Sequence, residues 1–235
     1  ILRFLEKLVN QGIRDHVHGG FYRYSTDVMW QQPHFEKMLY NQALLISTFS
    51  KAYEVFQDES YKSVVMDTIH FVQKWLLSAQ GGYYSGIDAD YLGSEGLYYM
   101  FSAQELALIE PKELNEFNWC TYDATNLIYP CSYKTLDNSL TKPLTNSSNS
   151  SANTAQDKLS NKVVYQQSDK PGESLSRARK ALLSIKSGLD KPHIDKKVIT
   201  AWNALMISAY VDAYIAFNDD SFLENAIALA DTINS

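Results

Sequence analysis

The feature that most constrains the fold is an internal repeat between two distant segments. Residues 41–61 read NQALLISTFSKAYEVFQDESY, and residues 202–222, which lie 161 positions later, read WNALMISAYVDAYIAFNDDSF. Apolar periodicity alone would not place Ser, Tyr and Asp at matched positions. The identical pairs are Ala43/Ala204, Leu44/Leu205, Ile46/Ile207, Ser47/Ser208, Ala52/Ala213, Tyr53/Tyr214, Phe56/Phe217, Asp58/Asp219 and Ser60/Ser221. The repeat predicts a helical hairpin, and because one hairpin cannot bury its own apolar faces, such units stack in an open solenoid or a closed ring.

The remaining periodicity predicts a mainly all-α chain that forms a single domain over residues 1–235. Apolar spacing predicts helices over residues 35–56, 60–78, 173–187, 198–217 and 221–233. The glycine-rich segment 81–106 predicts two short strands, followed by a helix that Ser102 caps with Glu105 three residues on. The tract LTNSSNSSANTAQDKLSN is too polar to bury apolar surface, so we predict an exposed or mobile insertion at about residues 133–162.

Composition excludes several classes of partner. A net charge of −6 and a pI near 5.4 argue against nucleic acid, because no basic surplus is present to neutralise phosphates. The chain has no apolar run of the length that spans a membrane. Cys120 and Cys131 match neither a redox nor a zinc motif. We interpret them as unpaired thiols in a reducing compartment, which predicts a cytoplasmic protein. We interpret the start at Ile1, which is not a methionine, as a sign that this chain was cut from a longer protein.

Candidate site residues cluster in two loops of similar chemistry, each just ahead of one repeated helix. In an array of hairpins, the loops at one end come together. Arg23 lies between two tyrosines, where it could stack on a ring or clamp an anionic group. His34 and Glu36 are also explained by a helix start, where the dipole favours Glu. The candidates are Arg23, Tyr24, Trp30, His34, Glu36 and Tyr40 in the first loop, and His193, Asp195, Lys196, Trp202 and Asn203 in the second.

A third group of candidates consists of acids in the segment between these loops. Asp88 and Asp90 would project from one face of a strand, and Glu95 follows. Crowded carboxylates have separated pKa values, so one can act as an acid and the other as a base, although acids that only cap turns explain the pattern equally well. A calcium loop is excluded by the residues at its later ligand positions. His16 and His18 alternate like metal ligands but lack a third, so we predict no metal and no cofactor.

Three motifs resemble, in order, those of the spermatogenesis-associated protein 20-like family: GGFYRYSTDVMWQQPHFEKMLYNQALL, GGYYSGIDAD with EGLYYMFSAQEL, and KPHIDKKVITAWNALMISA. Members of this family usually join a thioredoxin-like domain to an (α/α)6 toroid similar to N-acylglucosamine 2-epimerases and six-hairpin glycosidases. The resemblance covers about residues 8–108 and 173–235. It implies an incomplete (α/α)6 toroid with a small β-hairpin insertion, and a thioredoxin-like domain upstream in the full-length protein. The sequence departs from the family at Asn41-Gln42, where Asp-Asn is usual, and at Asp195-Lys196-Lys197, where one acid is lost.

The resemblance leaves four functions open. The first is a carbohydrate-directed toroid with epimerase or isomerase chemistry, in which His34 and His193 flank a carbon next to a carbonyl and Arg23 holds the substrate. The second is a non-catalytic module that binds a glycan or a protein. In the third, the motif residues form a structural plug joined by hydrogen bonds. The fourth is a glycoside hydrolase with paired carboxylates, drawn from Asp88, Asp90, Glu36 and Glu95.

Overall fold

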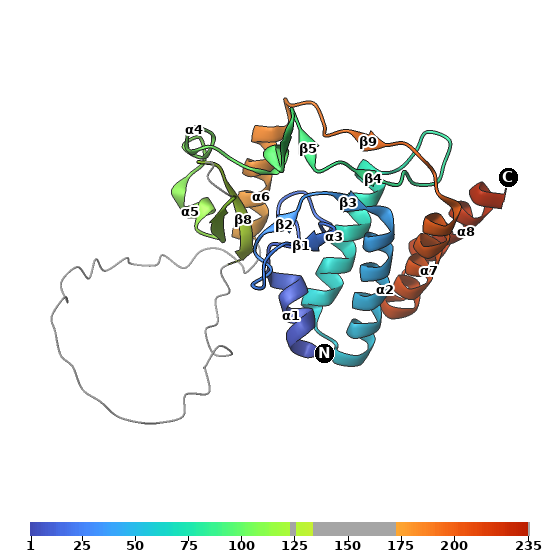
Figure 1. The fold of residues 1–235 in the computed structure, drawn as a ribbon. Coiled ribbons are helices and arrows are strands. Elements are labelled where there is room, and N and C mark those ends of the chain that lie inside the picture. The colour runs from blue at the N-terminus through green and yellow to red at the C-terminus, as the bar shows by residue number, and fades with distance from the viewer. Residues whose placement is uncertain (123–125, 134–172, 235) are drawn as a thin grey trace, which may run out of the picture.

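The computed structural model describes residues 1–122, 126–133 and 173–234, and within these ranges the fold is mainly α-helical, as predicted (Figure 1). The insertion predicted at about residues 133–162 lies outside the described residues beyond position 133. No helix in the described part of the chain is both long and apolar enough to cross a membrane. The helices are α1 (Leu2–Asn10), α2 (Leu39–Phe56), α3 (Glu59–Trp75), the short α4 (Ala103–Leu106) and α5 (Pro111–Leu114), α6 (Glu173–Lys186), α7 (Thr200–Phe217) and α8 (Asp220–Asn234), with a 3-10 turn at Leu97–Tyr99.

The predicted repeat is confirmed as two matched hairpins, α2–α3 and α7–α8. Helices α2 and α7 both have 18 residues. Each is followed by one residue in the left-handed region, Gln57 at φ 53° and Asn218 at φ 51°, which ends the helix. The next residue, Asp58 or Asp219, accepts a hydrogen bond from the backbone N–H two positions on, at 2.8 and 3.0 Å. The same local chemistry therefore turns the chain in both units.

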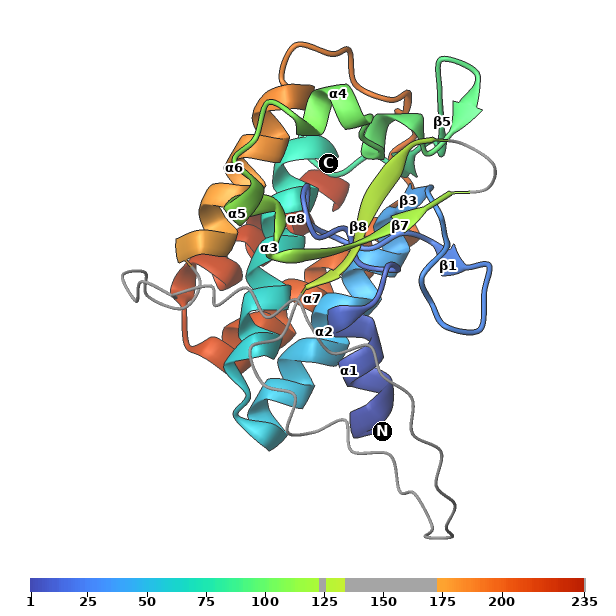
Figure 2. The same cartoon turned by 90° about the vertical axis from the view of Figure 1, so that its left-hand side faces the viewer.

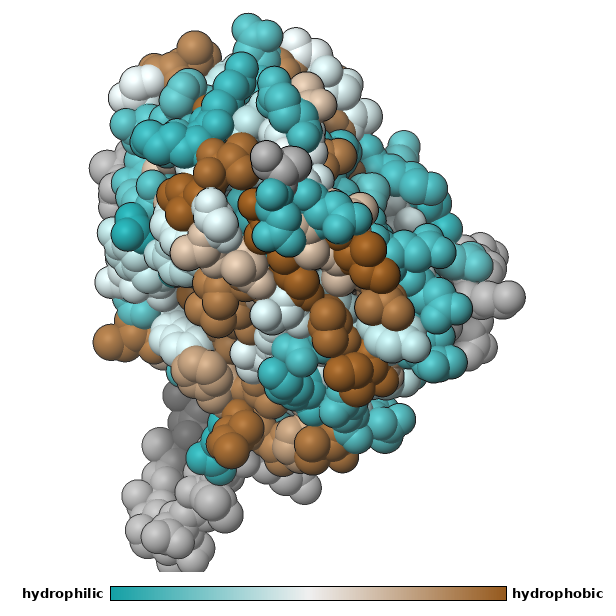
Figure 3. Space-filling model, turned by 90° about the vertical axis from the view of Figure 1, so that its right-hand side faces the viewer, coloured by the Kyte–Doolittle hydropathy of each residue, from teal (hydrophilic) through white to brown (hydrophobic). Residues whose placement is uncertain are grey.

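The two hairpins lie side by side, with α2 packed along α7. Near one end of these helices Tyr53 contacts Phe217 with ring centroids 5.0 Å apart, and near the other Tyr40 contacts Trp202 at 4.9 Å. Figure 3 shows apolar side chains gathered on the α7–α8 side of the molecule, where Ile215 is 61% exposed. An exposed apolar face at the end of a stack of hairpins fits the predicted incomplete toroid.

The loops at one end of the hairpins meet in a three-stranded antiparallel sheet. Its strands, in the order β3-β4-β9, are β3 (Lys37–Met38), β4 (Gly86–Ile87) and β9 (Ile194–Asp195). Lys37 pairs with Ile87, and Ile87 pairs with Ile194. Three segments far apart in the sequence are thus joined side by side. Two small ribbons accompany this sheet: β1 (Tyr24–Ser25) with β2 (Pro33–His34), and β5 (Asp90–Tyr91) with β6 (Ser94–Glu95).

One sequence prediction about local structure was wrong, and one strand hairpin was missed. Helix α2 begins at Leu39, not at residue 35, because the preceding residues are extended and β3 pairs with β4 instead. His34 and Glu36 therefore do not lie in a first helical turn. The hairpin of β7 (Phe117–Thr121) and β8 (Ile128–Tyr133) was not predicted (Figure 2). It packs with α4, α5 and α6 around a second, smaller core.

The bonding state of the two cysteines also differs from the prediction. Cys120 and Cys131 form a disulfide bond between β7 and β8, with their Cα atoms 5.7 Å apart. The interpretation as unpaired thiols is therefore wrong. The interpretation failed because the β7–β8 hairpin was not predicted. Pairing of these strands brings the two Cα atoms within the distance that a disulfide requires. The capping box at Ser102 and Glu105 is confirmed, although the helix that it starts has only four residues.

Candidate active site

One face of the β3-β4-β9 sheet presents a row of ionisable side chains. Continuing the register by one residue places Glu36 opposite Asp88, and the Asp88 N–H donates to the His193 carbonyl at 2.9 Å. Successive strand residues project to opposite faces, so this row lies on the face opposite Lys37, which is fully buried. Neighbouring strands are about 4.8 Å apart. The backbone positions of Glu36, Asp88 and His193, three predicted candidates from three separate loops, therefore lie within about 10 Å of one another across the strands.

Two histidine–carboxylate pairs accompany this row: one is part of it, and the other meets it through Glu36. His34 Nδ1 is 2.6 Å from Glu95 Oε1, and His193 Nδ1 is 2.7 Å from Asp88 Oδ2. Each carboxylate orients its ring through Nδ1, and His34 Nε2 points toward Glu36 Oε2 at 3.8 Å. The His34 side chain is 25% exposed, whereas that of His193 is 74% exposed. Both rings can exchange a proton at Nε2, one in a shielded position and one on an open surface.

Arg23 and several aromatic rings border the two pairs. The Arg23 guanidinium donates to Tyr40 Oη at 3.3 Å and to Glu36 Oε2 at 2.7 Å, and these hydrogen bonds raise the pKa of Arg23. Tyr24 stacks on the His34 ring with centroids 4.8 Å apart. Tyr40 in turn meets Trp202 edge to face, which links the first candidate loop to the second. Flat apolar rings beside polar groups suit a polyhydroxylated ligand.

Trp30 and Asn203 are not brought to this face. Trp30 packs against α1, 5.1 Å from the Phe4 ring and with the Lys7 ammonium 5.6 Å from its centroid. Asn203 is fully buried. Its Oδ1 accepts from the Tyr83 N–H at 2.7 Å, and its Nδ2 donates to the Tyr83 carbonyl at 3.0 Å. The Asn203 amide therefore positions backbone and has no donor or acceptor directed at the candidate site.

The remaining acids and Lys196 lie at the margin of the site. The Asp88–Asp90 pair does not form, because Asp88 bonds to His193, while Asp90 is exposed on β5 opposite Glu95. Asp195 binds Lys197 at 2.9 Å, and this contact, with a hydrogen bond from Ser85, lowers the pKa of Asp195. Lys196 is exposed beside it.

Two buried amides hold the site loops, and the role of both was missed by sequence reasoning. Gln42, which matches Asn203 in the repeat, accepts from the Phe21 N–H at 2.8 Å and donates to its carbonyl at 2.7 Å. Phe21 and Tyr83 both follow a Gly-Gly pair, and all four glycines have φ between 72° and 85°. These left-handed values favour glycine. Sequence reasoning could have found this role of Gln42 and Asn203 from two features: an amide at matched repeat positions, and a Gly-Gly-aromatic turn in each unit.

A buried ion pair underlies strand β3. Lys37 Nζ is 2.6 Å from Asp15 Oδ2 and donates to the Gly19 carbonyl at 2.9 Å. The ammonium lies over three rings at 4.4 to 5.0 Å, those of Tyr22, Phe71 and Tyr99. Burial by itself would raise the pKa of Asp15, but Lys37 and His18 hold it well below its usual range. This contact fixes the buried face of β3, so Glu36, the residue just before this strand, is directed outward.

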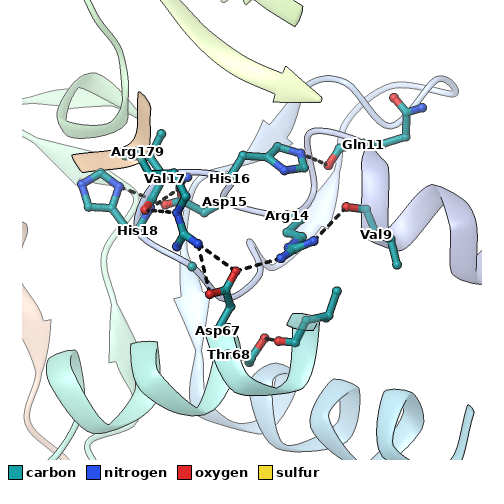
Figure 4. Close-up of polar contacts among 12 residues, drawn as sticks. Val9, Gln11, Arg14, Asp15, His16, Val17, His18, Asp67, Thr68 and Arg179 are labelled. Carbon is teal, nitrogen blue, oxygen red and sulfur yellow. Dashed lines mark hydrogen bonds and ion pairs between the residues drawn. The ribbon is translucent and has the colours of Figure 1, made fainter. Parts of the chain in front are cut away.

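A second charge cluster ties α3 to α6 and to the loop after α1 (Figure 4). Asp67 accepts from Arg14 at 2.9 Å and from Arg179 at 3.0 Å. Burial and the nearby Arg14 lower the pKa of His16 to about 3, and burial lowers the pKa of His18. In the described part of the chain no group of three or more His, Cys, Asp or Glu side chains is arranged to hold a metal ion.

Sequence relatives cover nearly the whole chain. It is 33% identical over 242 residues to spermatogenesis-associated protein 20 of Homo sapiens, covering 96% of this chain and 30% of that protein. The protein of the same name from Mus musculus is 30% identical over 219 residues, covering 89% and 28%. The predicted resemblance to this family is confirmed. The chain thus spans about 30% of the length of these curated relatives, and no family model matches it.

Solved structures also match across the chain, but the superpositions are loose. A D-mannose isomerase aligns with 98% of this chain and 49% of its own, with a TM-score of 0.35 and 14% identity. The cellobiose 2-epimerase of Spirochaeta thermophila aligns with 100% of this chain and 54% of its own, with a TM-score of 0.33 and 13% identity. Neither overlap is close enough to assign chemistry, so the function has to be argued from the side chains of the site.

Proposed function

We propose that the chain carries a carbohydrate-directed site that epimerises or isomerises a sugar by moving the proton on the carbon next to a carbonyl. The observation that supports this is two histidine–carboxylate contacts: His193 with Asp88 beside the sheet built from three loops, and His34 with Glu95 next to Glu36 of the first of those loops. Proton transfer at carbon needs a base and then an acid, and imidazole performs both near neutral pH.

The neighbouring groups have defined roles in this proposal. His34 Nε2 removes the proton from the carbon next to the carbonyl, and Glu95 stabilises the imidazolium that results. The Arg23 guanidinium stabilises the negative charge that develops on the carbonyl oxygen. Returning the proton from the opposite face through His193 inverts the carbon, whereas returning it to the neighbouring carbon isomerises the sugar. Tyr24 supplies an apolar surface for the sugar ring or chain.

The carboxylate contacts favour proton transfer at carbon over glycoside hydrolysis. A hydrolase needs one carboxyl group that is protonated at working pH. Glu36 binds Arg23, and both Glu95 and Asp88 bind an imidazole nitrogen. Each of these three carboxylates is thus already in contact with a nitrogen of a neighbouring side chain. The acids are therefore better suited to orienting histidines than to protonating a leaving group.

A second candidate, a non-catalytic glycan-binding module, is favoured by the exposure of the second pair. The His193 side chain is 74% exposed and that of Asp88 is 49% exposed. Sites that carry reactive intermediates usually exclude water. An open aromatic and polar face can still bind a glycan without reacting with it.

Exchange in heavy water separates the two candidates. A panel of aldoses and ketoses is incubated with the chain in D2O, and proton NMR follows loss of the signal from the carbon next to the carbonyl. Epimerase or isomerase activity predicts incorporation of deuterium and its loss, by at least about 100-fold, in His34→Gln. His70→Gln is the control, because His70 is an exposed residue of α3. Saturation-transfer contacts with a sugar but no exchange would support the binding module and refute the enzyme.

A further inference from the structure

We infer that the Cys120–Cys131 disulfide is a redox-sensitive clamp that sets the position of His34. The bond joins β7 to β8 and restrains the separation of these strands. Cys120 is partly exposed, whereas Cys131 is 2% exposed. A reductant therefore has access to the bond from the Cys120 side, while Cys131 is buried in the main apolar core. Regulation of sugar chemistry by this clamp rests on the proposed function, but the effect on His34 does not.

The hairpin reaches the His34 segment through two tyrosines. Tyr122 follows Cys120 by two positions, Tyr129 precedes Cys131 by two, and both rings meet the Phe35 ring edge on, at 5.2 and 5.5 Å. Phe35 is fully buried. The Tyr129 hydroxyl also donates to the Gln31 carbonyl at 2.6 Å. One tyrosine near each cysteine of the disulfide thus contacts the residue that follows His34.

The position of Phe35 determines the contact between His34 and its carboxylate. The Phe35 N–H donates to Glu95 Oε1 at 3.3 Å, and His34 Nδ1 contacts the same oxygen at 2.6 Å. A displacement of Phe35 therefore changes the His34–Glu95 distance directly. His193 and Asp88 are positioned by β4 and β9, whose backbone pairing involves neither β7 nor β8. They provide an internal reference within the same molecule.

The chemistry of the clamp is thiol–disulfide exchange with a dithiol. One thiolate of the dithiol attacks the Cys120 sulfur, and the Cys131 thiolate leaves. The second thiol of the reductant then attacks the mixed disulfide and releases Cys120. The dithiol is oxidised to its own disulfide, and the protein gains two thiols. Without the cross-link the open forms of the hairpin become more populated, because the bond no longer restricts how far the strands can separate.

Histidine NMR of the complete chain tests the clamp. Ring Hε1 signals of the five histidines, assigned by single substitutions, are compared before and after reduction with dithiothreitol, while a thiol titration follows the appearance of two free cysteines. We expect the His34 signal to shift or broaden and the His193 signal to stay in place. The Cys120→Ser/Cys131→Ser variant should show the reduced spectrum from the start and should not respond to dithiothreitol.

Three results would overturn the inference. They are a His34 signal that stays in place although two thiols appear, equal displacement of His34 and His193, and an oxidised sample that already titrates two thiols. If the clamp is correct and the proposed function also holds, reduction lowers deuterium exchange by about 10- to 100-fold, because a displaced base reacts slowly. Exchange that is absent in both states would refute the sugar chemistry and leave the clamp to be judged on the NMR data.

Discussion

Replacing Lys37 by Met gives the sharpest test of how the site loops are held. Met keeps most of the length of the side chain but removes the charge, which leaves the Asp15 carboxylate only 4% exposed and without the cation now 2.6 Å away. Removing one partner of a buried ion pair costs about 3–5 kcal/mol, because the remaining charge keeps its desolvation penalty. A domain of this size is stable by about 5–15 kcal/mol. The variant should therefore fold, with a melting midpoint lowered by roughly 6–20 °C.

Urea unfolding followed by circular dichroism measures this cost, and a matched substitution provides its control. Lys51 also forms an ion pair, with Asp212 at 2.8 Å, but its side chain is 64% exposed. Lys51→Met should cost less than about 1 kcal/mol, because solvent screens exposed pairs. The double variant Lys37→Met/Asp15→Asn should be more stable than Lys37→Met alone, since no uncompensated charge stays buried.

The cost should also depend on pH in a defined direction. In the native chain Lys37 and His18 hold the pKa of Asp15 well below its usual 3.8, so the stabilisation is present above that pH and is lost as the pH falls through the native pKa. In Lys37→Met we expect burial to raise the pKa of Asp15, so protonation relieves the penalty. The difference between the two proteins should shrink from pH 7 to pH 4.5. A cost equal to that of Lys51→Met, or one that does not vary with pH, would refute the reasoning.

The other predictions concern a buried amide, a buried histidine and a glycine. Asn203→Leu leaves the N–H and carbonyl of Tyr83 without partners, which should cost about 2–4 kcal/mol in urea unfolding. Because the native pKa of His16 is about 3, below its usual 6.5, stability should fall by about 1.4 kcal/mol per pH unit below pH 6.5, and His16→Gln should flatten that slope in urea titrations. Gly20→Ala should lower the thermal midpoint, since its φ is +72° and a Cβ would lie 2.6 Å from a neighbouring ring, whereas Gly188→Ala, with open space around it, should change little.

The shared location of the two candidate loops was predictable, because each loop directly precedes one of the repeated helices. Two loops that precede equivalent helices must lie at the same end of a stack of hairpins, which is why His34 and His193 could be expected on one side. In the structure His193 precedes strand β9 of the small sheet, whereas His34 lies in the separate β1-β2 ribbon and meets the first loop of that sheet through Glu36, with His34 Nε2 3.8 Å from Glu36 Oε2. Their carboxylate partners could not be assigned in advance. Glu95 lies 61 positions after His34 in the sequence, and no local pattern encodes their contact.

The sequence by itself determined the hairpins, their repetition and the Asp-containing turn inside each, although the cap of α3 is Asp58 rather than Ser60, which the sequence had suggested. These depend on contacts within a few residues, such as the Asp that caps each second helix and the left-handed residue before it. Only the tertiary structure decided the register of two-residue strands, the Cys120–Cys131 bond and the buried charge of Lys37. Such features arise where distant segments compete for the same partners. Their energies depend on burial and on exact distances, and the spacing of residues along the chain specifies neither quantity.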